Sequence, residues 1–162
     1  MSAATQEWMD LRSKDARRTQ LRRGATAVAA ARVAIGVAAL VWPAVPSRPW
    51  VGAGTGDGSA ELASRVFGRA LGGRDLGLGL GALVALGRLS REGDGEPEAE
   101  SASVWVAAGA LADALDVATT LVAWRDLPRV TRWLVIGSAA GAAVTGAAGA
   151  LALWPEAEIG AL

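Results

Sequence analysis

Three residue types that carry much of the chemistry of active sites are missing from this chain of 162 residues. It contains no cysteine, no histidine and no tyrosine. Their absence excludes disulfides, thiolate nucleophiles, metal sites built from cysteine or histidine, the usual haem ligands and an imidazole general base. Carboxylate and guanidinium groups therefore remain as the main carriers of chemistry.

An excess of charge of either sign is also lacking. The 16 basic residues balance the 16 acidic ones, so the chain as a whole has no basic field of the kind that nucleic-acid binding needs. We therefore expect no nucleic-acid partner. Lys14 is the only lysine, and alanine and glycine are abundant. This composition is typical of a GC-rich bacterial genome, which indicates a bacterial source.

Long apolar runs, in contrast, are plentiful. Hydrophobic residues make up 52% of the chain but aromatic residues only 5%, and the mean hydropathy is +0.31, which favours a membrane over water as the solvent. Four runs approach or exceed the roughly 20 residues that a helix needs to cross the hydrocarbon. The sequence thus predicts an all-α integral membrane four-helix bundle over residues 24–154, with spans at about 24–42, 65–89, 103–124 and 130–154. A basic segment, 1–23, precedes it and a short tail, 155–162, follows.

Basic residues before the first span set the expected orientation. The positive-inside rule places this cluster in the cytoplasm, and an even number of spans returns the C-terminus there, as in a multi-pass protein of the bacterial inner (plasma) membrane. Arg125, Arg129 and Arg132 oppose the rule, because they fall in the turn that this topology puts outside. We give precedence to the N-terminal cluster, which comprises Arg12, Lys14, Arg17, Arg18, Arg22 and Arg23.

Three polar segments flank or connect the spans. Gln6 to Arg23 is expected either to lie on the membrane surface, with Trp8 and Leu11 buried and its arginines facing anionic headgroups, or to act only as a topology signal. Pro43 to Glu61 is rich in proline and glycine and reads as an irregular linker, with Trp50 as an interfacial anchor or the segment as a cover over an outer opening. Ser90 to Ser103 is acidic and is expected to be a mobile cytoplasmic loop.

Glycine and alanine recur four residues apart within the spans, which favours close helix packing in lipid. The second span carries two such faces, so it is expected to contact two neighbours. Gly77, Gly79 and Ala82 also match G-x-G-x-x-A, but inside an apolar helix this pattern does not indicate a dinucleotide site, and no cofactor is expected. The two faces are Gly73, Gly77, Gly81 and Gly68, Gly72, Asp75, Gly79, Ala82; the other stripes are Ala25, Ala29, Arg32, Gly36 in the first span and Gly137, Gly141, Thr145, Gly149 in the fourth.

Six charged residues interrupt the apolar spans. Each charge at the centre of a bilayer costs on the order of 2.5 to 3.5 kcal/mol on insertion scales, so we expect them to pair inside the bundle. Asp113 and Asp116 are three residues apart and share a helix face with Gly109 and Thr120, where Arg32 and Arg74 can meet them. The six candidate site residues are Arg32, Arg69 and Arg74, for charge pairing or substrate binding, and Asp75, Asp113 and Asp116, as catalytic candidates.

These charges leave three functional alternatives open. A structural network would fix helix register and the choice of a partner, either a second copy or another membrane protein. Alternatively, one of two neighbouring carboxylates holds a proton, which suits a non-redox acid–base enzyme acting on a lipophilic substrate, such as an isomerase, cyclase or hydrolase. The same carboxylates would serve a proton-coupled transporter, for which a chain of this length would need to form an oligomer.

Two segments carry a resemblance to a known family. "RVFGRALGGRDLGLG" and "WVAAGALADALDVATTLVAWR" resemble small four-helix integral membrane proteins of unknown function that are common in actinobacteria. Those proteins carry an R-x-x-G-x-R-D-like segment in the second helix, here Arg69 to Asp75, and D-x-x-D in the third, here Asp113 to Asp116. The resemblance covers roughly residues 25–154 and implies the same topology and the same charged positions, but no particular reaction.

Overall fold

Four long helices make up almost all of the described chain. The computed structural model describes residues 3–43, 58–92 and 95–155, and within these ranges it contains helices and no strand. Each helix contains a segment long and apolar enough to cross a membrane. The expected all-α fold is thereby confirmed. The helices are α1 (Ala3–Val41), α3 (Gly58–Glu92), α4 (Glu96–Val122) and α5 (Arg129–Leu153).

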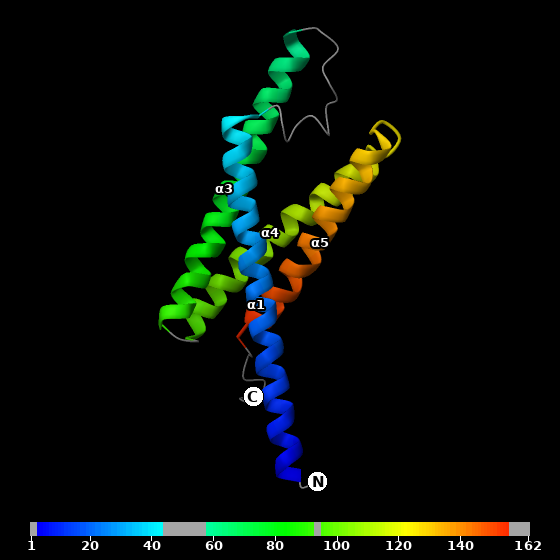
Figure 1. Ribbon diagram of the computed structural model, residues 1–162. Coiled ribbons are helices and arrows are strands. Elements are labelled where there is room, and N and C mark those ends of the chain that lie inside the picture. Colours follow the sequence, from blue (N-terminus) through cyan, green and yellow to red (C-terminus); the bar gives the residue numbers. More distant parts are fainter. Residues whose placement is uncertain (1–2, 44–57, 93–94, 156–162) are drawn as a thin grey trace, which may run out of the picture.

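The helices form a bundle in which each packs mainly against two neighbours, in the cyclic order α1, α3, α4, α5, and α1 also contacts α4. The closest pairs are α1 with α3 and α4 with α5. Figure 1 shows that these two pairs lie together where α3 gives way to α4, and that they splay apart toward the turn between α4 and α5. The bundle is therefore open along part of its length.

Glycine allows α1 and α3 to approach closely. A Cβ atom on Gly36 would lie 2.6 Å from the backbone nitrogen of Leu76, and one on Gly72 would lie 2.9 Å from the carbonyl oxygen of Gly36. Gly79 is equally close, with a Cβ position 2.8 Å from the carbonyl oxygen of Ala29. The second small-residue face predicted for α3 therefore packs against α1.

The other predicted face of α3 and the predicted stripe of α5 are only partly in contact with the bundle. Around the Cβ positions of Gly73 and Gly77 in α3, and of Gly137 and Gly141 in α5, nothing described lies within 4 Å. Gly81 instead meets the ring of Trp105 in α4, and Gly149 meets Ala25 in α1. Two of the three residues on α3 and two of the four on α5 thus face outward rather than into the bundle.

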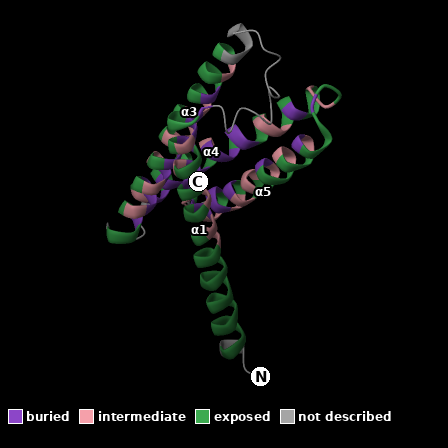
Figure 2. Cartoon of the chain, turned by 45° about the horizontal axis from the view of Figure 1, so that its top comes forward, coloured by how far each residue is buried: buried purple, intermediate pink, exposed green. Residues whose placement is uncertain are grey.

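The interior consists mainly of alanine, and large apolar side chains cover the exterior. The buried cluster lies at the closed end of the bundle and includes Leu86, Leu89 and Leu153 among many alanines. Exposed hydrophobic residues occur on every helix, for example Leu80, Leu111 and Val144, and Figure 2 shows exposed residues over the outside of the bundle. This distribution suits a protein whose surroundings are lipid, because lipid does not drive large apolar side chains inward.

One expectation about the polar segments is wrong. The loop expected over Ser90 to Ser103 is largely helical, since α3 continues to Glu92 and α4 begins at Glu96 with Pro97 in its first turn, a common position for proline. The segment Gln6 to Arg23 is continuous with the first span, because α1 runs unbroken from Ala3 to Val41 and projects beyond the bundle (Figure 1). Trp8 and Leu11 are exposed on the protein itself, and their burial in lipid stays a prediction. Trp50, most of its linker and residues 156–162 lie outside the described residues.

Candidate functional site

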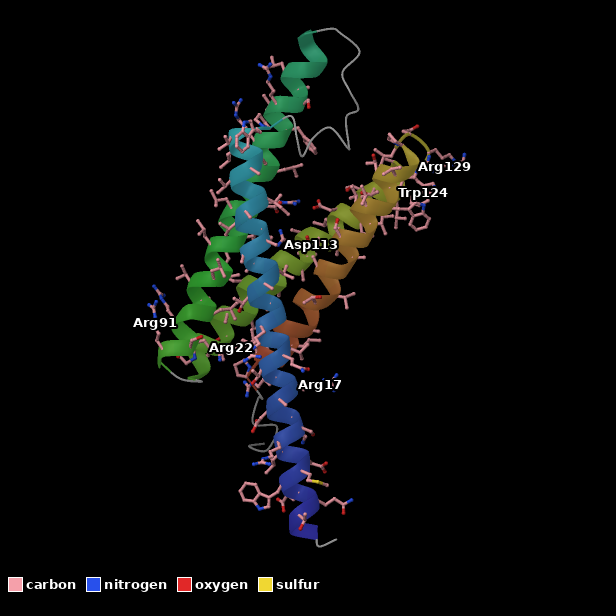
Figure 3. The ribbon with its side chains drawn as sticks, in the orientation of Figure 1. Arg17, Arg22, Arg91, Asp113, Trp124 and Arg129 are labelled. Carbon is pink, nitrogen blue, oxygen red and sulfur yellow. The ribbon has the colours of Figure 1, made fainter. Side chains whose placement is uncertain are left out.

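Five of the six charged residues singled out in the spans meet at one place. Arg32 comes from α1, Arg74 and Asp75 from α3, and Asp113 and Asp116 from α4. Asp113 lies where α1 crosses α4, as Figure 3 shows. Together these residues form a chain of alternating charge, in the order Asp113, Arg32, Asp75, Arg74, Asp116. We call this group the charge chain.

Arg32 is the buried centre of the charge chain, with an exposed fraction of 7%. Its Nη1 donates a hydrogen bond to Asp75 Oδ1 over 2.8 Å, and its Nη2 lies 2.6 Å from Asp113 Oδ2. Nη2 also donates to the carbonyl oxygen of Gly109. A Cβ atom on Gly109 would lie 3.3 Å from Arg32 Nε, so the missing side chain leaves room for the guanidinium group.

Arg74 forms the second junction of the charge chain. It donates two parallel hydrogen bonds to Asp116, from Nη1 to Oδ1 over 3.0 Å and from Nη2 to Oδ2 over 2.8 Å. Nη2 also donates to Asp75 Oδ1 over 3.1 Å, so Asp75 bridges the two arginines. Paired hydrogen bonds of this kind are among the stronger polar contacts in proteins, because both partners are charged and the geometry is fixed.

Negative charge exceeds positive charge in this group. Three carboxylates face two guanidinium groups, so the fully ionised charge chain carries one excess negative charge. Asp113 Oδ2 also accepts no hydrogen bond from any described residue. The ion-pair contact with Arg32 is short, yet no N–H of Arg32 is directed at this oxygen in hydrogen-bond geometry. Asp113 Oδ2 is therefore a buried oxygen held by its ion pair with Arg32.

The charge chain lies on the floor of a cleft of about 510 Å³. The walls are almost entirely apolar and include Val28 and Ile35 from α1 and Leu134 and Val135 from α5. Ile35 and Leu134 are 52% and 66% exposed, so the cleft opens between α1 and α5. Both residues belong to helices that are long and apolar enough to cross a membrane.

Arg69 does not join the other five residues. Its side chain is exposed, and within the described ranges no ion pair or hydrogen bond involves it. Arg69 lies four residues before Gly73 and eight before Gly77, hence on the outward face of α3. The expectation that three positive groups would meet three negative ones is therefore wrong at this residue.

Ser138 is a cleft residue that the sequence reading did not single out. It lies on α5 among apolar wall residues, and its hydroxyl donates to the backbone carbonyl oxygen of Leu134 over 2.8 Å. A lone serine in an apolar helix is the only signal that could have pointed to it. Such residues commonly bond back to their own helix, so the signal is weak.

Comparison of the chain with protein-family models, with curated proteins and with solved structures finds no match. The fold and the site therefore define its class by themselves. Over its described residues, the protein is an all-α, multi-pass membrane protein with four helices that can cross a membrane. A partly buried chain of arginine and aspartate side chains joins three of those helices.

Proposed function

We propose that this protein binds, in its lipid-facing cleft, a lipophilic molecule that carries a cationic or hydrogen-bond-donating group. The observation that carries this proposal is the excess carboxylate on the floor of an apolar cleft. Ionisable residues within a membrane span are costly, and where they face a cavity they usually serve a ligand, an ion or a proton. A lipophilic cation would fill the cleft and balance its charge.

The ion pairs that Arg32 and Arg74 already form argue against an anionic ligand. Both guanidinium groups already contact two carboxylates each, so an anion would have to compete with aspartate for the same donors. Asp116, in contrast, keeps 24% of its side chain exposed and lines the cleft. A ligand group that donates hydrogen bonds finds acceptors here. Arg74 lines the same cleft and keeps 31% of its side chain exposed, but its guanidinium group already contacts two carboxylates.

The charge chain has a structural task as well. It joins α1, α3 and α4 at a level where the helix pairs begin to diverge, which supports a role in fixing helix register. A purely structural network would have no need of an excess charge or of an open cleft. We therefore place ligand or partner binding first and regard the structural role as its foundation.

A non-redox acid–base enzyme is the second candidate. The third carboxylate of the charge chain supports it, because a carboxyl group beside an excess of negative charge can hold a proton and pass it to a bound substrate, while Asp116 accepts one. A transporter receives less support. The described space next to Arg32 and Gly109 on the side of Gly146 is only about 20 Å³, whereas transport needs a path past this level.

The basic N-terminal cluster and the family resemblance support a place for the protein in the bacterial plasma membrane. The positive-inside rule then puts the N-terminus in the cytoplasm. The cleft opens toward the end of the bundle that carries the turn between α4 and α5. In this orientation, the ligand enters from the outer half of the bilayer.

Binding of dodecylammonium tests the proposed function. The purified protein in a neutral detergent is titrated with dodecylammonium, and with dodecanol and dodecanoate as uncharged and anionic probes of the same chain length. We expect dodecylammonium to bind at least about tenfold more tightly than the other two, the ratio expected for one charge-assisted contact. The variant Asp113→Asn should lose this preference and remain folded, because it removes the excess charge.

Arg69→Gln is the matched control for that titration, since Arg69 lies outside the cleft. It should retain the preference for the amine. Equal affinity for the three probes, or a preference that survives in Asp113→Asn, would refute the proposal. Retained folding is checked by the melting temperature of each variant in the same detergent.

A further inference from the structure

A second concave site lies between α1 and α3, at the end of the bundle away from the charged cleft. Where α1 leaves the bundle beside the end of α3, an open groove of about 590 Å³ is lined by Arg22, Arg23, Thr19 and Thr26 of α1 and by Ser90 of α3. Figure 3 shows Arg22 and Arg91 at this same end of the bundle. The proposed function uses none of these residues.

A polar contact joins the two helices at this groove. Arg22 Nη2 donates to Ser90 Oγ over 2.6 Å and to the carbonyl oxygen of Leu86 over 3.4 Å. Ser90 Oγ in turn donates to the same carbonyl oxygen over 2.8 Å. The guanidinium group is thus anchored against α3 and does not swing freely in solvent, which lowers the entropy that binding would otherwise cost.

The charge around the groove is positive. Its described lining includes two arginines and no carboxylate. Arg88 and Arg91 lie near the end of α3, where Glu92 follows them, and the nearest acidic residue before the groove on α1 is Asp15, one turn before Thr19. Arginines gathered in this way recognise phosphate, because guanidinium donors match its oxygen atoms.

The position of the groove along α1 indicates where the phosphate comes from. Ala27 and Ala30 continue the groove from the arginines into the apolar part of α1. On the other side, α1 carries polar residues and projects beyond the bundle. The arginines therefore lie at the boundary between hydrocarbon and water, where the headgroups of lipids are found.

We propose that this groove binds the phosphate group of an anionic phospholipid, with an acyl chain lying along Ala27 and Ala30. Arg22 and Arg23 hold the phosphate beside the hydroxyl group of Thr19. Thr26 and Ser90 line the groove as well, but their hydroxyl groups already donate to the carbonyl oxygens of Arg22 and Leu86. The inference does not depend on the charged cleft or on its ligand. It replaces a diffuse attraction between the basic segment and the membrane with one defined site.

Native mass spectrometry with phosphatidylglycerol tests the proposal. The protein in neutral detergent is mixed with phosphatidylglycerol or, as the uncharged comparison, phosphatidylcholine, and retained lipid is counted. We expect one phosphatidylglycerol to be retained preferentially. Arg23→Gln should weaken retention about tenfold, as expected for loss of one charge-assisted contact, and its melting temperature without lipid should not change, because Arg23 is exposed.

The matched control is Arg17→Gln, which removes the same charge from α1. Arg17 is exposed and, being two residues before Thr19, points away from the groove; we expect it to retain the lipid like the unaltered chain. Equal weakening by Arg17→Gln and Arg23→Gln would overturn the site in favour of a diffuse basic field. Equal retention of phosphatidylcholine would overturn it too, and stabilisation by inorganic phosphate alone would assign the groove to a soluble phosphate.

Discussion

At the scale of single residues, Arg32 is the side chain on which the most buried polar contacts depend. It is the shared partner of Asp75, Asp113 and the carbonyl oxygen of Gly109, and thereby joins α1 to both α3 and α4. A charged group at this depth is tolerated because each of its neighbours is an acceptor. Its removal would leave three carboxylates facing one guanidinium group.

Replacement of Arg32 by glutamine should therefore be severe. We expect Arg32→Gln to lower the free energy of unfolding by about 3–5 kcal/mol, the cost of leaving buried charges without their partner. Arg69→Gln, which makes the same chemical change at an exposed position, should lower it by less than about 0.5 kcal/mol. Denaturant titration of both variants in detergent measures the difference, and equal losses would contradict the importance given to the charge chain.

The sequence predicts most of this site but cannot predict all of it. The three-residue spacing of Asp113 and Asp116 places them on one face of α4, and charge balance points to Arg32 and Arg74 as partners. Arg69 carries the same charge and differs only in which face of α3 it occupies. Both faces of α3 carry small residues, and only the packing of α1 on one of them decides which arginine is left outside.

At the scale of helices, the contact between α1 and α3 depends on glycine at its closest points. Gly36 and Gly72 face each other so closely that the backbones themselves are in contact. In lipid, such contact supplies dispersion energy that larger residues would prevent. Asp75, three residues after Gly72, is held within reach of Arg32 by this approach.

Alanine at Gly36 should disturb the helix pair. Its Cβ would lie 2.6 Å from the backbone of Leu76, and since backbone cannot step aside, we expect Gly36→Ala to cost about 1–3 kcal/mol of stability. Gly77→Ala on α3 is the matched control, because nothing described lies within 4 Å of its Cβ position. It should be neutral, or stabilising by up to about 1 kcal/mol through helix propensity. Unfolding in detergent compares the two; a loss at Gly77 as large as that at Gly36 would be inconsistent with the observed contact.

Helix number and type follow from the sequence, but helix ends do not. Polar composition suggested a loop from Ser90 to Ser103, yet Ala99 and Ala102 are buried and Ser103 donates a hydrogen bond to the carbonyl oxygen of Ala150 in α5. Alanine and glutamate are both good helix formers, so a helix can extend through a segment that looks too polar for a membrane. Where a helix ends depends here on what it can pack against.

At the scale of the whole molecule, the bundle has two different ends. One carries the projecting part of α1, the junction of α3 with α4 and the end of α5; the other carries the turn from α4 to α5 (Figure 1). At that turn, Arg132 lies over the ring of Trp124 at 5.1 Å, and Trp124 meets Trp133 edge to face. Tryptophan is enriched where membrane meets water, so this group marks one boundary of the membrane-crossing region.

The absence of native cysteine makes the orientation directly measurable. Ser13→Cys on the projecting part of α1 and Arg125→Cys at the turn each introduce a single, exposed thiol. In intact cells, a membrane-impermeant maleimide should label the thiol at position 125 but not the one at position 13, because the positive-inside rule puts the N-terminal cluster in the cytoplasm. The reverse pattern would show that the three arginines of the turn determine the orientation.

The unbroken length of α1 has a mechanical consequence. About 20 of its 39 residues suffice to cross the hydrocarbon, so the remainder extends roughly 30 Å beyond it at 1.5 Å per residue. In a continuous helix, a tilt of one part moves the other part in the opposite direction. If α1 tilts by about 10° within the bilayer to widen the cleft beside α5, its free end sweeps about 5 Å in the opposite direction. A tilt of α1 that widened the cleft would thus displace its far end in the water outside the membrane.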